Sequence, residues 1–204
     1  SNKSAVLFNK HIRMSILYRQ DEVEAGDYLM VVRNNYYYVP PNAPSGFVAN
    51  GDFVWVKKLV STEEMYGFRF ATLELRLVDT PDADAFEAKV LLDTLHTNTP
   101  AITPEQNKEL YYNVLEDYQD ITDKKKLNEK LREDPYLNAL QIKYAYAVTC
   151  HKSQGGQWKS VFVDQGYITE EQINREYLRW LYTAVTRATE ELFLVNFNSK
   201  LFSV

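Results

Sequence analysis

The sequence of 204 residues has one cysteine, three histidines and no apolar run of the roughly 20 residues that a membrane-spanning helix needs. The single thiol, Cys150, excludes an internal disulfide and suits a reducing compartment. It does not complete a zinc-binding set with His11, His96 and His151, which are far apart in the chain. The N-terminus also lacks the basic, apolar and small-residue zones of a signal peptide. We therefore expect a cytoplasmic protein with no membrane partner and no metal site of its own.

The charge of the chain is slightly acidic and unevenly distributed. A formal net charge of −5 argues against a protein that coats nucleic acid by bulk electrostatics. Residues 61–134 carry 17 acidic and 9 basic residues, net −8, so the remainder is net +3. Residues 136–163 contain no acid and include Lys143, Lys152 and Lys159. This stretch predicts a local basic surface, with chance composition as the alternative.

Residues 144–157 combine an apolar, β-prone run with a polar loop. The loop contains Thr149, His151, Lys152 and Ser153, followed by a pair of glycines at 155 and 156. Because glycine lacks a Cβ, a backbone freed at two such positions can approach an anion closely. The segment therefore indicates a site for a phosphate or another anion.

Residues 181–188 have the pattern of a helix end that carries one cation. The run Leu-Tyr-Thr-Ala-Val-Thr-Arg-Ala presents Thr183, Thr186 and Arg187, and Arg187 is its only basic residue. A fixed guanidinium near a helix end suits a phosphate. In isolation, Arg187 could equally complement the helix dipole or pair with Glu190 or Glu191.

In their order and spacing, these two segments resemble motifs V and VI of superfamily 1 helicases. The RecD-like branch has patterns close to T-x-H-K-[SA]-Q-G-S-E and L-Y-x-A-x-T-R-A, and the second is matched almost completely by residues 181–188. In the first, Gly156 and Gln157 replace the usual Ser and Glu, and that Glu typically meets the nucleotide sugar in the family. An amide can still hydrogen-bond a hydroxyl group.

The resemblance implies a role for each matching residue. Arg187 is expected to be catalytic, as an arginine finger that reaches the γ-phosphate of ATP. ATP contacts are expected from Gly155, Gly156, Gln157 and Arg187. Contacts to the DNA backbone are expected from Thr149, His151, Lys152, Ser153 and Gln154.

Two of these residues have ordinary alternatives. His151 is as consistent with a simple hydrogen-bonded loop histidine as with a role toward DNA or nucleotide. A thiol-protease pair of Cys150 and His151 is disfavoured, because neighbouring side chains at a strand end point apart and no third group is indicated.

The sequence has no G-x-x-x-x-G-K-[ST] loop. ATP and Mg²⁺ would therefore be held mainly by a P-loop domain that precedes this segment in the same chain. We expect the fragment alone to be inactive as an ATPase.

The remaining segments predict a barrel and a helical region. Residues 53–93 contain several short β-rich runs, which favour a small barrel. The apolar phase changes within 68–78, which predicts a bulge near Ala71 and Thr72. Residues 103–106 form a capping box before a helix, as do residues 169–172. The Lys124–Lys126 run, surrounded by acids, is expected to be a solvated helix face.

The expected fold class is α/β: a parallel-sheet RecA-like domain of the P-loop NTPase type, without its own P-loop, with an inserted SH3-like β-barrel and a helical segment. Residues 4–18 are expected to run from a short strand into a helix. The expected divisions are 1–50 for the first part of the RecA-like domain, 51–98 for the SH3-like barrel, 99–135 for the helical segment and 136–204 for the second part.

The leading hypothesis is the C-terminal part of an ATP-dependent DNA helicase that translocates on single-stranded DNA. Relatives in the RecD-like branch act in DNA repair and recombination, so a nuclease or recombination partner is compatible with it. The alternative is a helicase-derived DNA-binding module without ATPase activity. A third hypothesis, an SH3-like module for proline-rich peptides, would need an aromatic groove lined by Trp55 or Tyr36–Tyr38.

Overall fold

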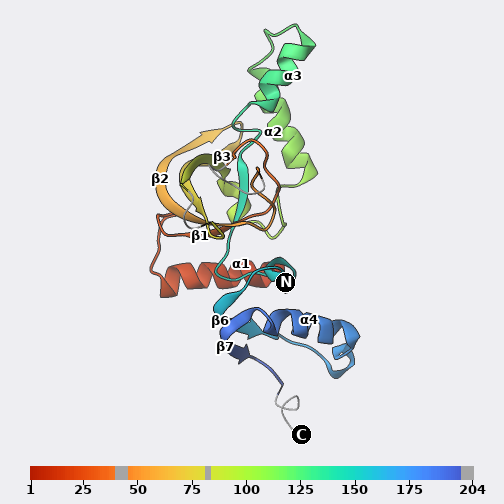
Figure 1. Cartoon of the computed structure of the whole chain (residues 1–204). Helices are drawn as coiled ribbons and strands as arrows, with labels where there is room; N and C mark the ends of the chain where they lie inside the picture. Colours follow the sequence, from red (N-terminus) through yellow and green to blue (C-terminus); the bar gives the residue numbers. More distant parts are fainter. Residues whose placement is uncertain (40–45, 81–83, 199–204) are drawn as a thin grey trace. The chain divides into compact units, whose positions relative to one another are not determined.

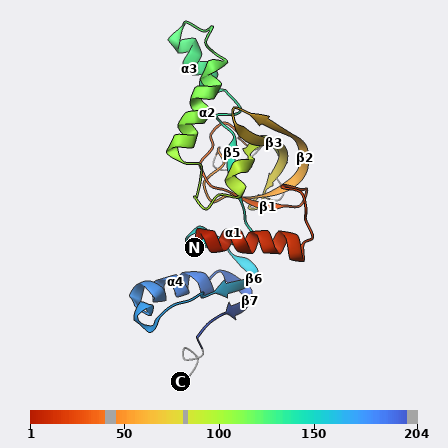
Figure 2. The same ribbon diagram turned by 180° about the vertical axis from the view of Figure 1, so that it is seen from behind.

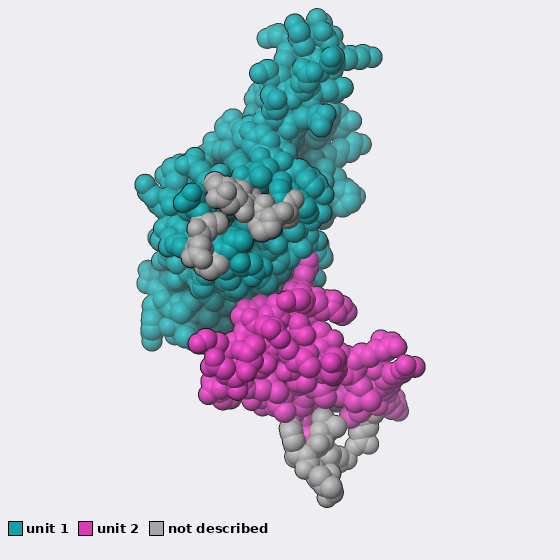
Figure 3. Space-filling view, viewed as in Figure 1, with its two compact units in different colours: residues 1–147 teal, residues 148–204 magenta. Residues whose placement is uncertain are grey.

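The computed structural model describes residues 1–39, 46–80 and 84–198. The chain divides into two compact units, residues 1–147 and residues 148–204, which Figure 3 colours separately. Across the described residues, no helix has the length and apolar character to cross a bilayer.

The first unit is built on a closed barrel of five strands in the order β1-β2-β3-β4-β5 (Figure 1). Neighbouring strands are antiparallel except for β4 and β5, and β5 closes the barrel by pairing antiparallel with β1. Alternate residues of these strands point inward and form the main apolar core, including Leu29, Leu73, Leu75, Leu140 and Ile142. The strands are β1 (Tyr28–Val31), β2 (Phe53–Met65), β3 (Phe68–Leu77), β4 (Phe86–Leu91) and β5 (Leu140–Tyr144).

Strand β3 contributes side chains to two apolar clusters. Phe68 and Phe70 belong to a second apolar cluster outside the barrel, whereas Ala71, Leu73 and Leu75 belong to the barrel core. The apolar pattern of residues 68–78 therefore changes phase because one face of β3 is buried in the second cluster and the other face in the barrel core. An irregularity does lie opposite Thr72, but the shift between Leu59 and Ser61 places the extra residue on β2.

The second cluster is covered by a helical arm between β4 and β5. It begins after a short 3₁₀ turn, η2 (Leu92–Leu95), and consists of α2 (Pro104–Glu116) and α3 (Lys124–Arg132). The predicted capping box of Thr103 and Gln106 is confirmed, and Leu110 and Val114 are buried. In Figures 1 and 2, α2 lies beside the barrel and α3 extends farther from the strands. Asp123 caps α3 by accepting from the backbone N–H groups of Lys125 and Lys126.

The N-terminal segment is helical from its start, so the short strand expected near residue 4 is wrong. Helix α1 (Asn2–His11) continues into a π-helical turn, η1 (Ile12–Ile16). Asn9 is buried and pairs twice with the backbone of Ala147: its Nδ2 donates to the carbonyl at 2.7 Å, and its Oδ1 accepts from the N–H at 2.9 Å. A helix explains this contact, because it places Asn9 and Arg13 on one face, four residues apart.

Arg13 belongs to a buried polar cluster centred on Asp27, which has no exposed surface. The Nε and Nη2 of Arg13 both donate to this carboxylate at 2.9 Å, and Arg19 Nη1 lies 2.9 Å from it. The Tyr146 hydroxyl donates to the same group at 2.8 Å. A bidentate guanidinium with further donors satisfies a charge that would otherwise be costly to bury.

The second unit is a strand–helix–strand arrangement. Strands β6 (Trp158–Asp164) and β7 (Ala188–Val195) are parallel, and α4 (Arg175–Val185) connects them. Of the capping box expected at Thr169, the bond from its N–H to Gln172 Oε1 is present, but it precedes only a short turn, η4 (Glu170–Gln172), and not the helix. Helix α4 begins after Asn174, whose side chain accepts from two backbone N–H groups.

The expected parallel-sheet RecA-like fold is wrong. The larger sheet is a closed barrel with mostly antiparallel neighbours, and in the described residues only β4–β5 and β6–β7 are parallel pairs. Strands β1 and β5, expected in the parallel sheet, instead pair with each other and with β2 and β4. Short apolar strands do not identify their partners by sequence pattern. The SH3-like barrel expectation fits loosely, and the four expected domain divisions stay a prediction.

Replacing Arg13 with alanine is expected to lower the free energy of unfolding of the first unit by about 3–5 kcal/mol, because Asp27 would lose its bidentate partner while staying buried. Urea unfolding measures the change. Arg69→Ala is the control, since its ion pairs with Glu22 and Asp93 are half exposed and should contribute about 1 kcal/mol or less. Equal losses in the two variants would contradict this role for Arg13.

Lys143 predicts a pH dependence of stability. Its Nζ donates to the carbonyl and hydroxyl of Thr97, and burial lowers the pKa of Lys143 to about 8 from 10.5. Between these values the folded state binds fewer protons than the unfolded state, so stability should rise with pH across this window. Lys143→Met should remove that increase in urea titrations performed at pH 8 and pH 10. An identical slope in wild type and variant would assign the increase to other groups.

Candidate functional site

The polar loop after β5 is a single tight turn. The 3₁₀ turn η3 (Cys150–Ser153) begins after Thr149, whose carbonyl accepts from the N–H groups of Lys152 and Ser153 at 2.9 and 3.1 Å. The buried Ser153 hydroxyl donates to the carbonyl of Cys150 at 2.8 Å. Ser153 therefore shapes the turn from inside, and His151 stands exposed on it. We call residues 149–157 the motif loop.

The two glycine positions of the motif loop favour glycine for different structural reasons. Gly155 has φ +87°, and a Cβ there would meet no atom within 4 Å. This backbone conformation favours glycine and leaves one side of the loop open. Gly156 is instead confined by a neighbour: a Cβ at this position would lie 2.4 Å from Cη2 of Trp158. A serine, usual at this position in the RecD-like pattern, would require the Trp158 ring to move.

Arg187 connects the end of α4 to the motif loop. Its Nη1 donates to the carbonyl of Gly156 at 3.1 Å, and its Nε donates to the carbonyl of Thr183 at 2.9 Å. The backbone N–H of Trp158 donates in turn to the Arg187 carbonyl at 2.9 Å. In the described part of the chain, no carboxylate forms a salt bridge with Arg187, because Glu190 pairs with Lys159 and Glu191 accepts from Ser160. The alternative pairing with Glu190 or Glu191 is therefore not what holds this arginine.

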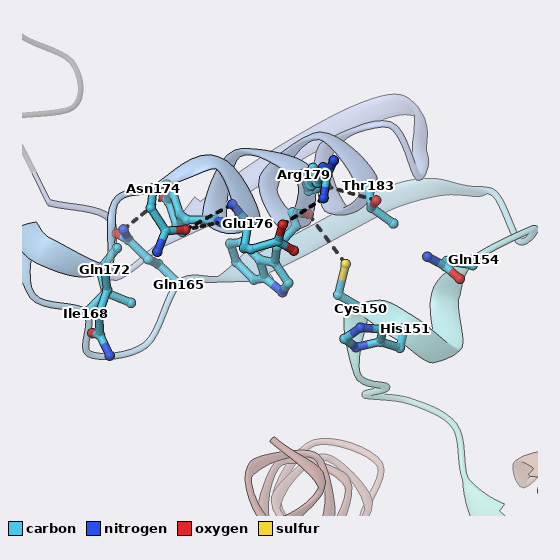
Figure 4. A pocket seen from close by; sticks show the side chains of 12 residues that line it. Cys150, His151, Gln154, Gln165, Ile168, Gln172, Asn174, Glu176, Arg179 and Thr183 are labelled. Atoms are coloured by element: carbon cyan, nitrogen blue, oxygen red, sulfur yellow. Dashed lines mark hydrogen bonds and ion pairs between the residues drawn. The ribbon is translucent and has the colours of Figure 1, made fainter.

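Two side chains of the turn, Cys150 and Lys152, have shifted pKa values. Burial raises the pKa of the Cys150 thiol, and the positive charge of Arg187 opposes this only partly. The thiol also donates to the carbonyl of Trp180 at 3.5 Å, the dashed line from Cys150 in Figure 4. A protonated, hydrogen-bonded thiol is a poor nucleophile. Burial also lowers the pKa of Lys152.

The motif loop and α4 enclose a cleft of about 530 Å³. Figure 4 shows Cys150, His151 and Gln154 on one side of it and residues of α4 on the other. The aromatic side chains of Tyr177 and Trp180 complete this wall.

The predicted site residues fall into four groups. Gly156 and Arg187 are in direct contact, and Thr149, Lys152 and Ser153 share one turn. His151 and Gln154 line the cleft. Gln157 and Gly155 are exposed beside the turn.

Sequence analysis missed Asn9, Trp158 and Trp180. Asn9 holds Ala147, two residues before the motif loop, Trp158 packs against Gly156, and Trp180 lines the cleft. The spacing of Asn9 and Arg13 was visible in the sequence, but their burial was not, since Asn and Arg on helices are mostly solvated.

A comparison with protein families matches residues 144–195 to the UvrD-like helicase C-terminal domain. The match covers about a quarter of the chain and contains both the motif loop and Arg187. This match supports a superfamily 1 helicase C-terminal region within residues 144–195. Uncharacterized protein R530 of Acanthamoeba polyphaga mimivirus is 39% identical over 59 residues, which are 29% of this chain and 11% of the viral protein.

Alanine substitutions at the two glycines should destabilise the second unit by separable mechanisms. Gly155→Ala should cost about 1–2 kcal/mol because of its positive φ, whether or not Trp158 is present. Gly156→Ala should be destabilising with Trp158 in place and close to neutral in a Trp158→Ala background, because the clash is with that ring. Urea unfolding of the single and double variants measures the coupling. Additive effects for the Gly156 and Trp158 substitutions would contradict the steric explanation.

Proposed function

We propose that this chain supplies the C-terminal part of an ATP-dependent DNA helicase of the RecD-like branch, which translocates on single-stranded DNA. The observation that carries the proposal is the hydrogen bond from Arg187 to the carbonyl of Gly156. It joins the arginine proposed to act on ATP to the loop proposed to bind DNA, within one compact unit. The match of residues 144–195 to a helicase domain supports this assignment.

The DNA contacts are proposed for one side of the motif loop. Thr149, His151, Lys152, Ser153 and Gln154 would meet the strand, with His151 and Gln154 exposed and Lys152 half-buried. Hydroxyl groups, backbone N–H groups and a lysine are common partners of phosphate oxygens. Ser153 would act mainly through its N–H and its effect on the turn, because its hydroxyl is buried and already donates to Cys150.

The nucleotide contacts are proposed for the other part of the loop. Arg187 uses three of its five N–H groups within its own unit, and the other two have no partner among the described residues. Its half-buried guanidinium and the open side of Gly155 fit the phosphate end of ATP. Gly156 and the exposed Gln157 would lie beside it, with Gln157 offering an amide to the sugar. When bound, ATP and Mg²⁺ supply the γ-phosphoryl group and neutralise part of its charge.

The shared hydrogen bond gives a route for coupling the two activities. If Arg187 shifts toward a phosphate, the carbonyl of Gly156 must shift with it or lose its donor. The backbone bond between Trp158 and Arg187 restricts the same movement from the other side. Displacement of the loop would then change its grip on the strand. A P-loop domain of the same chain would hold ATP and Mg²⁺, because this sequence has no such loop.

A DNA-binding module without ATPase activity is the second candidate. It is favoured by one observation: the hydrogen bonds of Arg187 already form a self-contained link inside the unit, as expected of a residue that only shapes the loop.

Arg187→Ala is expected to lower strand-stimulated ATP hydrolysis about 10³-fold in a chain that includes the P-loop domain, with strand binding retained. Arg175→Ala is the matched control, since it removes an exposed arginine from the first position of the same helix. Hydrolysis by the Arg187 variant at the wild-type rate would refute the role of Arg187 as an arginine finger. No hydrolysis in either protein, with strand binding intact, would favour the module without ATPase activity.

A further inference from the structure

The cleft between η3 and α4 has the size of a small-molecule site. Its volume of about 530 Å³ lies within the roughly 300–1,000 Å³ of typical ligand pockets. All of its lining residues belong to the second unit. None of the roles proposed above for Arg187 or the glycines requires it.

Three polar groups that line this cleft have no hydrogen-bond partner within the described residues. They are the imidazole of His151, the amide of Gln154 and the indole N–H of Trp180. Figure 4 shows His151 and Gln154 extending from the motif loop below α4. His151 and Gln154 are exposed and Trp180 is half-buried, so a ligand could engage these groups.

On the α4 side of the cleft, the aromatic ring of Trp180 is held in place by the buried Tyr177. Trp180 stacks on Tyr177, with ring centroids 5.7 Å apart and an interplanar angle of 26°. Tyr177 is buried, and its hydroxyl accepts from Gln165 Nε2 at 3.0 Å. The ring of Trp180 therefore has a fixed partner on one side and remains partly exposed beside the cleft. A rigid, half-exposed indole is suited to stacking on another planar ring.

The charges around the cleft favour a neutral ligand. Glu176 and Arg179 pair with each other at 2.7 Å, so they largely cancel. Four other residues of the lining carry neutral amides, and two of them, Gln172 and Asn174, use their oxygens for the local backbone. Their remaining amide N–H groups are donors. The lining therefore matches a planar, uncharged group whose edge carries acceptors and donors, as a nucleobase does.

We propose that this cleft takes one base of the single strand whose backbone lies along the motif loop. The inference rests on the proposed function, because His151 and Gln154 belong both to that loop and to the cleft. The base stacks on Trp180, while His151 and Gln154 contact its edge. This contact fixes the register of the strand on the loop and tolerates several bases, since every base offers a π-face.

The test is strand binding by the 204-residue chain, using thymidine oligonucleotides of about 12 nucleotides that carry one abasic position in turn. At one position, loss of the base should weaken binding to the wild type about tenfold. In Trp180→Ala, the same abasic strand should bind less than about twofold more weakly than the intact strand, because the stacking partner is already absent. His151→Ala combined with Gln154→Ala should reduce the abasic effect as well, and neither side chain has contacts that folding requires.

Leu178→Ala is the matched control. Leu178 is 58% exposed on the same helix and does not line the cleft, so this variant should keep the tenfold abasic effect. Abasic strands that all bind like the intact strand, or an equal loss in wild type and Trp180→Ala, would overturn the base site alone. Failure of the wild type to bind the intact strand would overturn the proposed function itself. Free thymidine monophosphate could instead quench the tryptophan fluorescence of the wild type as strongly as the strand does, and fail to quench that of Trp180→Ala. That result would reassign the cleft to free nucleotides.

Discussion

The buried carboxylate of Asp27 is the constraint on which the arrangement of the first unit depends. A charge without access to water must be surrounded by donors and opposite charges. Here Arg13 on η1 and Tyr146 beyond β5 donate hydrogen bonds, and Arg19, just after η1, forms an ion pair. Arg13 also lies over the ring of Tyr144, 4.5 Å from its centroid. Satisfying one anion therefore fixes the N-terminal helix against the strands that close the barrel.

The same cluster and the neighbouring Asn9 fix the last four residues of the first unit. Each residue from 144 to 147 is held: Tyr144 by Arg13, Ala145 by the carbonyl of Tyr28, Tyr146 by Asp27, and Ala147 by Asn9. These four residues are thus fixed within the first unit. Within the second unit, Arg187 has a comparable part, because its hydrogen bonds join the end of α4 to the motif loop. Hydrogen bonds from polar side chains therefore contribute to the geometry of both segments.

Local features were predictable where a few neighbouring residues decide the outcome. The capping box at Thr103 and the turn containing Thr149 to Ser153 depend on short-range hydrogen bonds, and both are present. The partners of β1 and β5 were not predictable, because strands of four or five residues are compatible with a parallel or an antiparallel neighbour. The bulge predicted near Ala71 and Thr72 is present as a register shift opposite Thr72, but its extra residue lies on β2. The phase change itself reflects burial of both faces of β3.

The sequence by itself determined the chemistry of the candidate site: the residue types of the motif loop, its glycine pair and the arginine at the helix end. It could do so because these segments are short and their chemical character is local. Only the tertiary structure decided that β1 to β5 close into a barrel, that Asn9 and Arg13 are buried, and that Trp180 and His151 line one cleft. Those outcomes depend on contacts between residues up to 138 positions apart, for which strand and helix periodicity carries no information.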